Sequence, residues 1–162
     1  MSELDQLAAD VGAVLKKKGQ ILATAESCTG GGIAETITRI PGSSAWFDCA
    51  FVTYSNEAKA TMLGVKLNTL ITYGAVSEET AREMAEGAFS LSSPRANTIV
   101  AVTGIAGPDG GQPGKPVGTV CFAWKLTTNS IISETCNFLG DRAAVRHQTI
   151  VHALTQLLHN LA

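Results

Sequence analysis

Apolar residues recur at spacings of three and four in several stretches of the chain, and this spacing predicts amphipathic helices. The first helix spans the apolar positions from Leu4 to Leu15 and is expected to end at Gly19. A short helix over residues 56–63 would start after a capping Ser55 and stop at Gly64. Three more helices are expected after the glycines at 30–32, after Ser77 with Ala81, Met84, Ala85 and Ala88 buried, and from near Asp141 with Ile150, Leu154, Leu157 and Leu161 buried.

Short apolar runs between these helices predict strands. The runs cover residues 20–24, 50–54, 98–102, 120–125 and 130–138, and the polar turn at 127–129 joins the last two. The run at 98–102 is short and apolar, as expected of a strand that is covered on both faces. Helices and strands alternate before two adjacent strands appear. We therefore expect an α/β fold, a three-layer α/β/α sandwich with a mixed, mostly parallel sheet.

Length and composition favour a single globular domain over residues 1–162. The chain is 45% hydrophobic and 16% charged, and its formal net charge of −2 argues against a general electrostatic grip on nucleic acid or an anionic membrane. No apolar run reaches the roughly 18 residues needed to cross a bilayer, and the first ten residues lack a signal-peptide pattern. We expect a cytoplasmic protein with no nucleic-acid or membrane partner.

The cysteines and histidines show no spacing typical of a metal site. Cys28 stands in a glycine-rich segment, whereas the other cysteines fall in apolar or strand-like surroundings and are expected to be small core residues: Cys49, Cys121 and Cys136. The histidines all lie on the last predicted helix. Two of them, His152 and His159, share a face with no acidic or cysteine companion at ligand spacing. We therefore expect neither a metal site nor a cofactor.

The segment from Ala25 to Gly32, with the sequence AESCTGGG, is the most distinctive of the chain. It follows the first predicted strand, so that Ser27 and Cys28 would lie at a helix N-terminus, where free N–H groups and the helix dipole favour a developing anion. The standard nucleotide motifs are absent, because Glu35 replaces the third glycine of the dinucleotide motif and Pro116 replaces the Ser or Thr of a P-loop. Tight turns alone would also explain such glycine-rich loops.

Other polar residues follow the ends of further predicted strands. Tyr54 ends one strand, Lys59 comes one helical turn after Ser55, and a second glycine-rich loop begins at Thr103. Ligands bind at the carboxyl ends of strands in open α/β sheets, so we expect Ser27, Tyr54, Lys59 and Thr103 to meet at one sheet edge. A lysine that burial keeps uncharged can take the proton of a serine nucleophile. Tyr54 could relay that proton or position the leaving group.

Several further residues could bind or react at this edge. The main-chain N–H groups of the turn formed by Cys28, Thr29, Gly30 and Gly31, or that of Gly104, could hold an oxyanion. Cys28 is a rival nucleophile, because a helix N-terminus lowers the pKa of a thiol. Arg142 follows the predicted N-cap Asp141 and could bind a phosphate, with Arg146 one turn further on the same face.

Seven stretches spread over nearly the whole chain carry a family resemblance. They are residues 25–31, 42–47, 52–59, 74–78, 103–111, 115–120 and 140–142. In these stretches the chain resembles the CinA C-terminal domain family. The resemblance implies that the carboxamide of nicotinamide mononucleotide (NMN) is hydrolysed to nicotinic acid mononucleotide and ammonia, a step of NAD salvage, without metal.

The same resemblance assigns roles to individual residues. It implies that Ser27 is the nucleophile, Lys59 its base and Tyr54 their partner, while Thr103 and Gly104 line the nicotinamide pocket and Arg142 grips the phosphate. It also favours a homo-oligomer, and we expect a dimer with the apolar last helix as a possible contact. The alternative function is a catalytically silent, nucleotide-binding regulatory module of the competence- and damage-inducible CinA family. A nucleic-acid-binding role is third.

Overall fold

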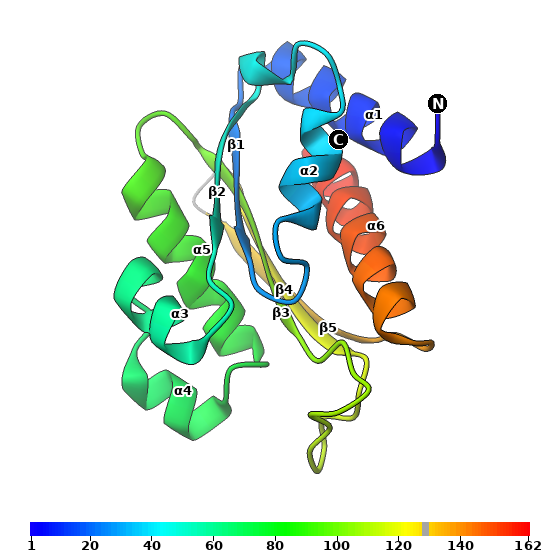
Figure 1. The fold of residues 1–162 in the computed structure, drawn as a ribbon. Coiled ribbons are helices and arrows are strands. Elements are labelled where there is room, and N and C mark those ends of the chain that lie inside the picture. Colours follow the sequence, from blue (N-terminus) through cyan, green and yellow to red (C-terminus); the bar gives the residue numbers. More distant parts are fainter. Residues whose placement is uncertain (128–129) are drawn as a thin grey trace.

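A computed structural model describes residues 1–127 and 130–162 of the chain and shows three layers (Figure 1). The helices are α1 (Glu3–Lys18), α2 (Gly32–Thr38), α3 (Asn56–Leu63), α4 (Leu67–Tyr73), α5 (Glu78–Ser92) and α6 (Arg142–Leu161), and a 3-10 turn lies at Ser43–Ala45. The strands are β1 (Leu22–Glu26), β2 (Phe47–Val52), β3 (Thr98–Gly104), β4 (Thr119–Lys125) and β5 (Ile131–Asn137).

The strands form one sheet in the order β2-β1-β3-β4-β5. Strand β1 runs parallel to both of its neighbours, β2 and β3, whereas β4 is antiparallel to β3 and to β5. Four strands, β2, β1, β3 and β5, therefore point in one direction and β4 points in the other. The predicted mixed, mostly parallel sheet is confirmed.

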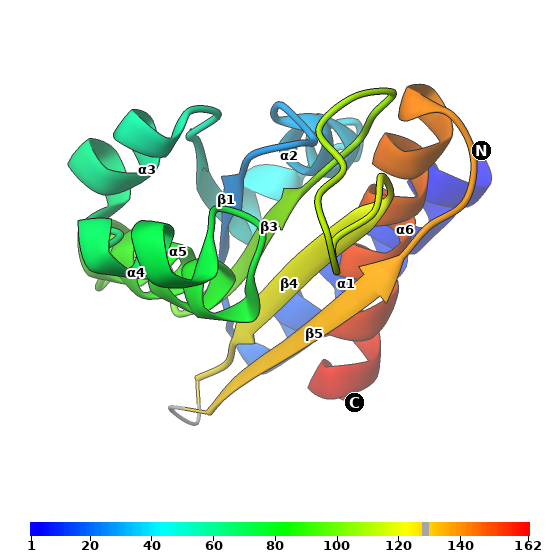
Figure 2. The same ribbon diagram turned by 90° about the horizontal axis from the view of Figure 1, so that it is seen from below.

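Helices cover both faces of this sheet (Figure 2). One face packs against α1, α2 and α6, and its core includes Val100 and Val102 of β3. The other face packs against α5, with α3 and α4 outside it, and its core includes Ile99 and Ala101. Alternate residues of a strand point to opposite faces, so a strand between two helical layers has to be apolar throughout. The predicted three-layer sandwich is confirmed, and β3 is its central buried strand.

Local signals located most of the helices, and pairing within the sheet decided the strand ends. The helix predicted at 56–63 is confirmed, with the Ser55 side chain accepting the N–H of Ala58 and Gly64 in the left-handed conformation at the end. Strand β1 lies two residues later than predicted, and β2 three residues earlier at its start. Helix α4 was not predicted, because it is short and no side chain caps its N-terminus. In the turn predicted at 127–129, residues 128 and 129 lie outside the described part of the chain.

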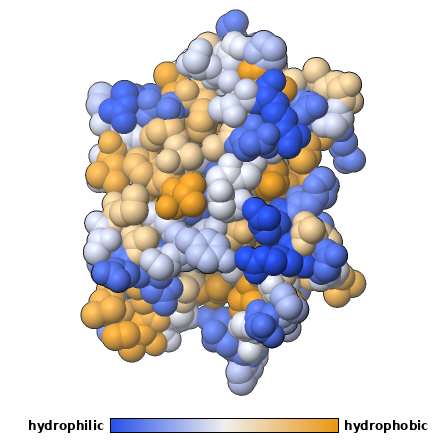
Figure 3. Space-filling model, viewed as in Figure 1, coloured by the Kyte–Doolittle hydropathy of each residue, from blue (hydrophilic) through white to orange (hydrophobic). Residues whose placement is uncertain are grey.

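The last helix uses its apolar stripe within the chain. Val145, Leu154, Leu157 and Leu161 are buried in the core, and Ile150 packs against it half-buried. These side chains are therefore not available for a subunit contact, and a homo-oligomer stays a prediction. Exposed apolar side chains are found instead on α3 and α4: Met62, Leu67, Ile71 and Tyr73. A hydrophobic patch lies over α4, at the lower left of Figure 3. No helix in residues 1–127 and 130–162 is both long and apolar enough to cross a membrane.

Candidate active site

The loops that follow β1, β2 and β3 meet at one edge of the sheet, namely the end where these three parallel strands have their carboxyl ends. Main-chain hydrogen bonds extend the parallel pairing beyond the strands: the N–H of Ser27 donates to Val102 O at 3.1 Å, and the N–H of Thr53 donates to Glu26 O at 2.9 Å. This edge is the lower end of the sheet in Figure 1. The expectation that residues after the three strand ends converge here is confirmed.

Ser27 and Lys59 are in direct contact at this edge. Lys59 Nζ lies 2.9 Å from Ser27 Oγ and 3.0 Å from the main-chain oxygen of Tyr54. The Lys59 side chain is only 2% exposed, and this burial lowers the pKa of its amine, although the nearby Cys28 opposes the shift. Uncharged, the amine can accept the Ser27 proton while still donating to Tyr54 O. The pair therefore has the geometry and the electrostatics of a nucleophile with its base.

Tyr54 contacts this pair through its backbone and contacts Arg142 through its side chain. Its carbonyl accepts a hydrogen bond from Lys59, whereas its hydroxyl lies on an exposed side chain and accepts one from Arg142 Nη2 at 2.9 Å. Arg142 also donates through Nη1 to Gly107 O at 2.8 Å. The Tyr54 hydroxyl thus belongs to the arginine side of the site, where it can help to position a ligand.

A cavity of about 180 Å³ opens beside the Ser27–Lys59 pair. The predicted site residues that line it are Ser27, Cys28, Tyr54, Lys59, Thr103, Gly104 and Arg142. The remaining lining residues were not expected from the sequence: Asn56, Ala75, Val76 and Ala106. The Thr103 hydroxyl donates to Ala75 O at 2.8 Å, which fixes the chain opposite Ser27. The lining of the cavity thus includes the Ser27 hydroxyl, the Lys59 amine and the Arg142 guanidinium.

Thr29, Gly30 and Gly31 shape the turn and do not line this cavity. Gly30 and Gly31 have φ angles of 58° and 94°, a left-handed conformation that glycine adopts without strain. The N–H of Gly30 donates to Ser27 O at 3.0 Å, so that this predicted oxyanion donor is already engaged. Their contribution is to turn the chain sharply from β1 into α2.

Glu26 is a buried residue of the site that the sequence reasoning missed. Its carboxylate accepts hydrogen bonds from two hydroxyls, those of Thr24 and Thr29, and from two N–H groups at the start of α2, those of Ile33 and Ala34. A carboxylate at a helix N-terminus satisfies free N–H groups and interacts favourably with the helix dipole. Glu26 therefore fixes the turn that carries Ser27. The available signal was an acidic residue inside an apolar run, directly before the serine.

Cys28 differs from the expectation for a reactive thiol. Its side chain is 5% exposed, and burial raises the pKa of the thiol to about 11, whereas helix N-terminal placement alone predicted a lowered value. The thiol is consequently protonated at neutral pH. Arg146 donates to Cys28 O and to Thr29 O, both at 3.1 Å, and so ties the turn to α6.

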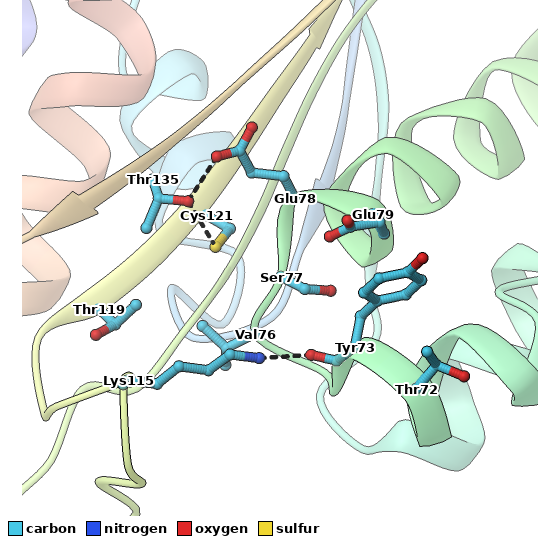
Figure 4. A pocket seen from close by; sticks show the side chains of 11 residues that line it. Thr72, Tyr73, Val76, Ser77, Glu78, Glu79, Lys115, Thr119, Cys121 and Thr135 are labelled. Atoms are coloured by element: carbon cyan, nitrogen blue, oxygen red, sulfur yellow. Dashed lines mark hydrogen bonds between the residues drawn. The ribbon is translucent and has the colours of Figure 1, made fainter.

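A larger cavity of about 660 Å³ lies between the α4–α5 junction and the strands β4 and β5 (Figure 4). It shares Val76 with the Ser27 cavity, but none of the residues predicted to bind or react lines it. Hydrogen bonds join residues of its lining: Lys115 donates to Tyr73 O, and Thr135 donates to Glu78. The smaller cavity therefore holds the candidate chemistry.

His152 has companions that its sequence spacing did not reveal. Its Nε2 lies 3.4 Å from Cys136 Sγ and is hydrogen-bonded to the carboxylate of Glu134. The expectation that it has no acidic or cysteine companion is wrong, because these companions come from β5, across the interface between sheet and helix. His159 is not part of this group.

Comparison with known proteins agrees with the fold and with the motifs. The CinA C-terminal domain family model matches residues 4–161. The nicotinamide-nucleotide amidohydrolase PncC of Escherichia coli K12 is 54% identical over 96% of this chain and 93% of its own length, and that of Pseudomonas putida is 51% identical over 98% and 97%. A CinA superfamily structure from Klebsiella pneumoniae superposes with a TM-score of 0.93 and 38% identity, covering 99% of this chain and 98% of the other.

Proposed function

The chain belongs to the CinA C-terminal domain family, and we propose that it is a nicotinamide-nucleotide amidohydrolase that releases ammonia from NMN. Relatives that carry this activity in their names match it over nearly their full length. The observation that carries the proposal is the buried Lys59 amine 2.9 Å from the Ser27 hydroxyl. A serine beside a lysine amine whose pKa is lowered by burial is suited to amide hydrolysis through an acyl-enzyme.

The reaction would proceed in two halves. Neutral Lys59 takes the proton of Ser27 as Oγ attacks the carboxamide carbon, and the main-chain N–H of Cys28, which lines the cavity, stabilises the oxyanion. Lys59 then gives its proton to the departing nitrogen, which leaves as ammonia. Water, activated by the same amine, releases nicotinic acid mononucleotide and restores Ser27. All proton transfers use the one pair of side chains, so the reaction requires no other acid or base.

Arg142 is proposed to bind the phosphate of the substrate. It lines the cavity on the first turn of α6, and its present acceptors are the Gly107 carbonyl and the Tyr54 hydroxyl. A phosphate is a stronger acceptor than either, since it carries negative charge and can accept two parallel N–H bonds from the guanidinium. The nicotinamide would then lie between Arg142 and Ser27, beside Thr103 and Gly104.

Incubation of the purified protein with NMN, with ammonia measured, tests the proposed activity. We expect stoichiometric ammonia and nicotinic acid mononucleotide. Tight binding of NMN without product would instead support the catalytically silent regulatory module. Absence of both NMN binding and product would contradict the amidohydrolase and the regulatory module alike.

The activity is expected to rise with pH. Burial favours the uncharged form of Lys59, which places its pKa below the usual lysine value. Because only the uncharged amine can accept the Ser27 proton, kcat/KM should increase as the pH rises through this lowered pKa and level off above it. A pH profile of kcat/KM measures the inflection. A rate that falls over the same range would contradict the role of Lys59 as a base.

Replacing Arg142 with methionine should raise KM for NMN by about 10- to 100-fold, the loss of one or two charge-assisted bonds. Nicotinamide riboside, which has the same carboxamide but no phosphate, is the matched control substrate. Its kcat/KM should change much less in Arg142→Met. Equal losses for both substrates would argue that Arg142 acts on the site through Tyr54 and does not bind phosphate.

Replacing Cys28 with alanine should leave kcat within about tenfold of the wild type, because the buried thiol is protonated and Ser27 supplies the nucleophile. Some stability would be lost, since Cys28 belongs to the core. Ammonia release by the folded variant is the measurement. If Cys28→Ala were inactive while Ser27→Ala stayed active, the nucleophile would be Cys28 and not Ser27.

A further inference from the structure

A second chemical cluster lies between β5 and α6, and none of its residues lines the Ser27 cavity. It consists of Glu134 and Cys136 on β5 and His152 on α6. Cys136 Sγ is 3.4 Å from Glu134 Oε1 and 3.4 Å from His152 Nε2, and the imidazole is hydrogen-bonded to the carboxylate. The three donor atoms all lie within 4.8 Å of one another. They converge on one point from two elements, the strand β5 and the helix α6.

The fold places these donors in a fixed arrangement. Glu134 and Cys136 are two residues apart on β5 and therefore share the face that looks toward α6. Each pairs across the sheet with a core residue, Phe122 and Val120 respectively. The imidazole of His152 packs against the ring of Phe122, with 4.8 Å between the ring centroids. The rings of Trp124 and Phe138 also surround it, with centroid distances of 6.1 and 5.9 Å. These rings restrict the orientation of the imidazole before any ligand binds.

We propose that Glu134, Cys136 and His152 form a binding site for a zinc-like divalent ion. A thiolate, an imidazole and a carboxylate are the ligand types of Zn²⁺, whereas Mg²⁺ and Ca²⁺ select sites made of oxygen alone. Cys136 would bind as the thiolate and release its proton to solvent as the ion binds. Bonds of about 2.3 Å to sulfur and about 2.0 Å to nitrogen or oxygen set tetrahedral donor atoms roughly 3.5 Å apart. Both distances from Cys136 Sγ match this value.

The distance between Glu134 and His152 can adjust to the same tetrahedral geometry. Glu134 and His152 are closer than tetrahedral ligands, so the carboxylate has to move outward when the ion binds. Its side chain is 43% exposed, and solvent lies on that side of the cluster. After this movement, water can occupy the fourth coordination position of the ion. The proposed site thus has three protein ligands and one open position.

Such an ion would join the edge strand β5 to the helix that carries Arg142 and Arg146. Among the strands in residues 1–127 and 130–162, β5 pairs with β4 alone. An ion bound to the folded state alone raises stability in proportion to the logarithm of its concentration above Kd. The ion is proposed to link β5 to α6 independently of the amide hydrolysis at Ser27, and its open position distinguishes the site from the closed four-ligand sites of purely structural zinc.

Titration of the chelator-treated protein with Co²⁺, a spectroscopic substitute for Zn²⁺, tests the proposal. We expect one equivalent of Co²⁺ to give a thiolate-to-cobalt charge-transfer band, and Zn²⁺ to displace it and to raise the Tm. Cys136→Ser should abolish the band. His152→Gln and Glu134→Gln should each weaken Co²⁺ binding, the loss of a direct ligand costing at least about 100-fold.

Cys49→Ser is the matched control, because Cys49 is also a half-buried strand cysteine but lies on β2, at the opposite edge of the sheet. This variant should keep the band and the Tm increase. A wild type without the band, a band retained in Cys136→Ser, or one lost in Cys49→Ser would overturn the proposal. Glu134→Gln changes an exposed side chain, so its binding can be measured even if the Cys136 variant fails to fold.

Discussion

Replacement of Lys59 with methionine is expected to reduce ammonia release from NMN by about 10⁴-fold or more, the loss seen when a nucleophile is deprived of its base. Methionine fills similar space without the amine, so the buried position stays packed. Ser27 Oγ would then have no group beside it to take its proton. Steady-state ammonia release, together with circular dichroism to establish folding, is the measurement.

Ser27→Ala should give a loss of the same size, and the double variant should lose no more than either single one, because the two side chains act as a unit. Lys66→Met is the matched control: Lys66 is exposed, lies at the start of α4 and lines no part of the Ser27 cavity. It should keep full activity. Additive losses in the double variant would mean that Lys59 and Ser27 contribute separately, contrary to the proposed mechanism.

The sequence predicted those parts of the fold that depend on nearby residues. Ser55 and Gly64 mark the two ends of α3, and each acts within its own helical turn. The strand ends depend on distant pairing: Glu26 is the last residue of β1 because it pairs with Val52 and Val102 on its two sides. Neither partner could be identified from the apolar run itself. This is why the strands were found but their ends were displaced.

In the candidate site, too, some contacts could be predicted from the sequence and others depend on distant parts of the chain. Ser27 and Lys59 could be brought together from the sequence, because parallel strands deliver their following loops to one edge. That Tyr54 contributes its carbonyl to the pair and its hydroxyl to Arg142 follows from the path of the chain between β2 and α3. The cluster around His152 depends on which residues of β5 face α6. That pairing joins positions 16 and 18 residues apart, and no spacing rule in the sequence covers it.

Glu26 provides the strongest test of how the turn is held. Replacing it with alanine should lower the free energy of unfolding by about 3–5 kcal/mol, because it leaves buried hydrogen-bond donors without an acceptor and opens a cavity. The donors affected are the Thr24 and Thr29 hydroxyls and the N–H groups of Ile33 and Ala34. Urea unfolding with an unchanged m-value would measure the loss.

Glu35→Gln is the matched control on α2. Glu35 is exposed and its carboxylate pairs with Arg39 one turn along the same helix, an arrangement worth only about 0.3–0.5 kcal/mol. The contrast between the two acids isolates burial from charge. Since Ser27 directly follows Glu26, Glu26→Ala should also lower kcat in the fraction that remains folded, while Glu35→Gln leaves it unchanged. A loss of stability no larger than that of Glu35→Gln would mean that the glycines and Arg146 hold the turn without the buried carboxylate.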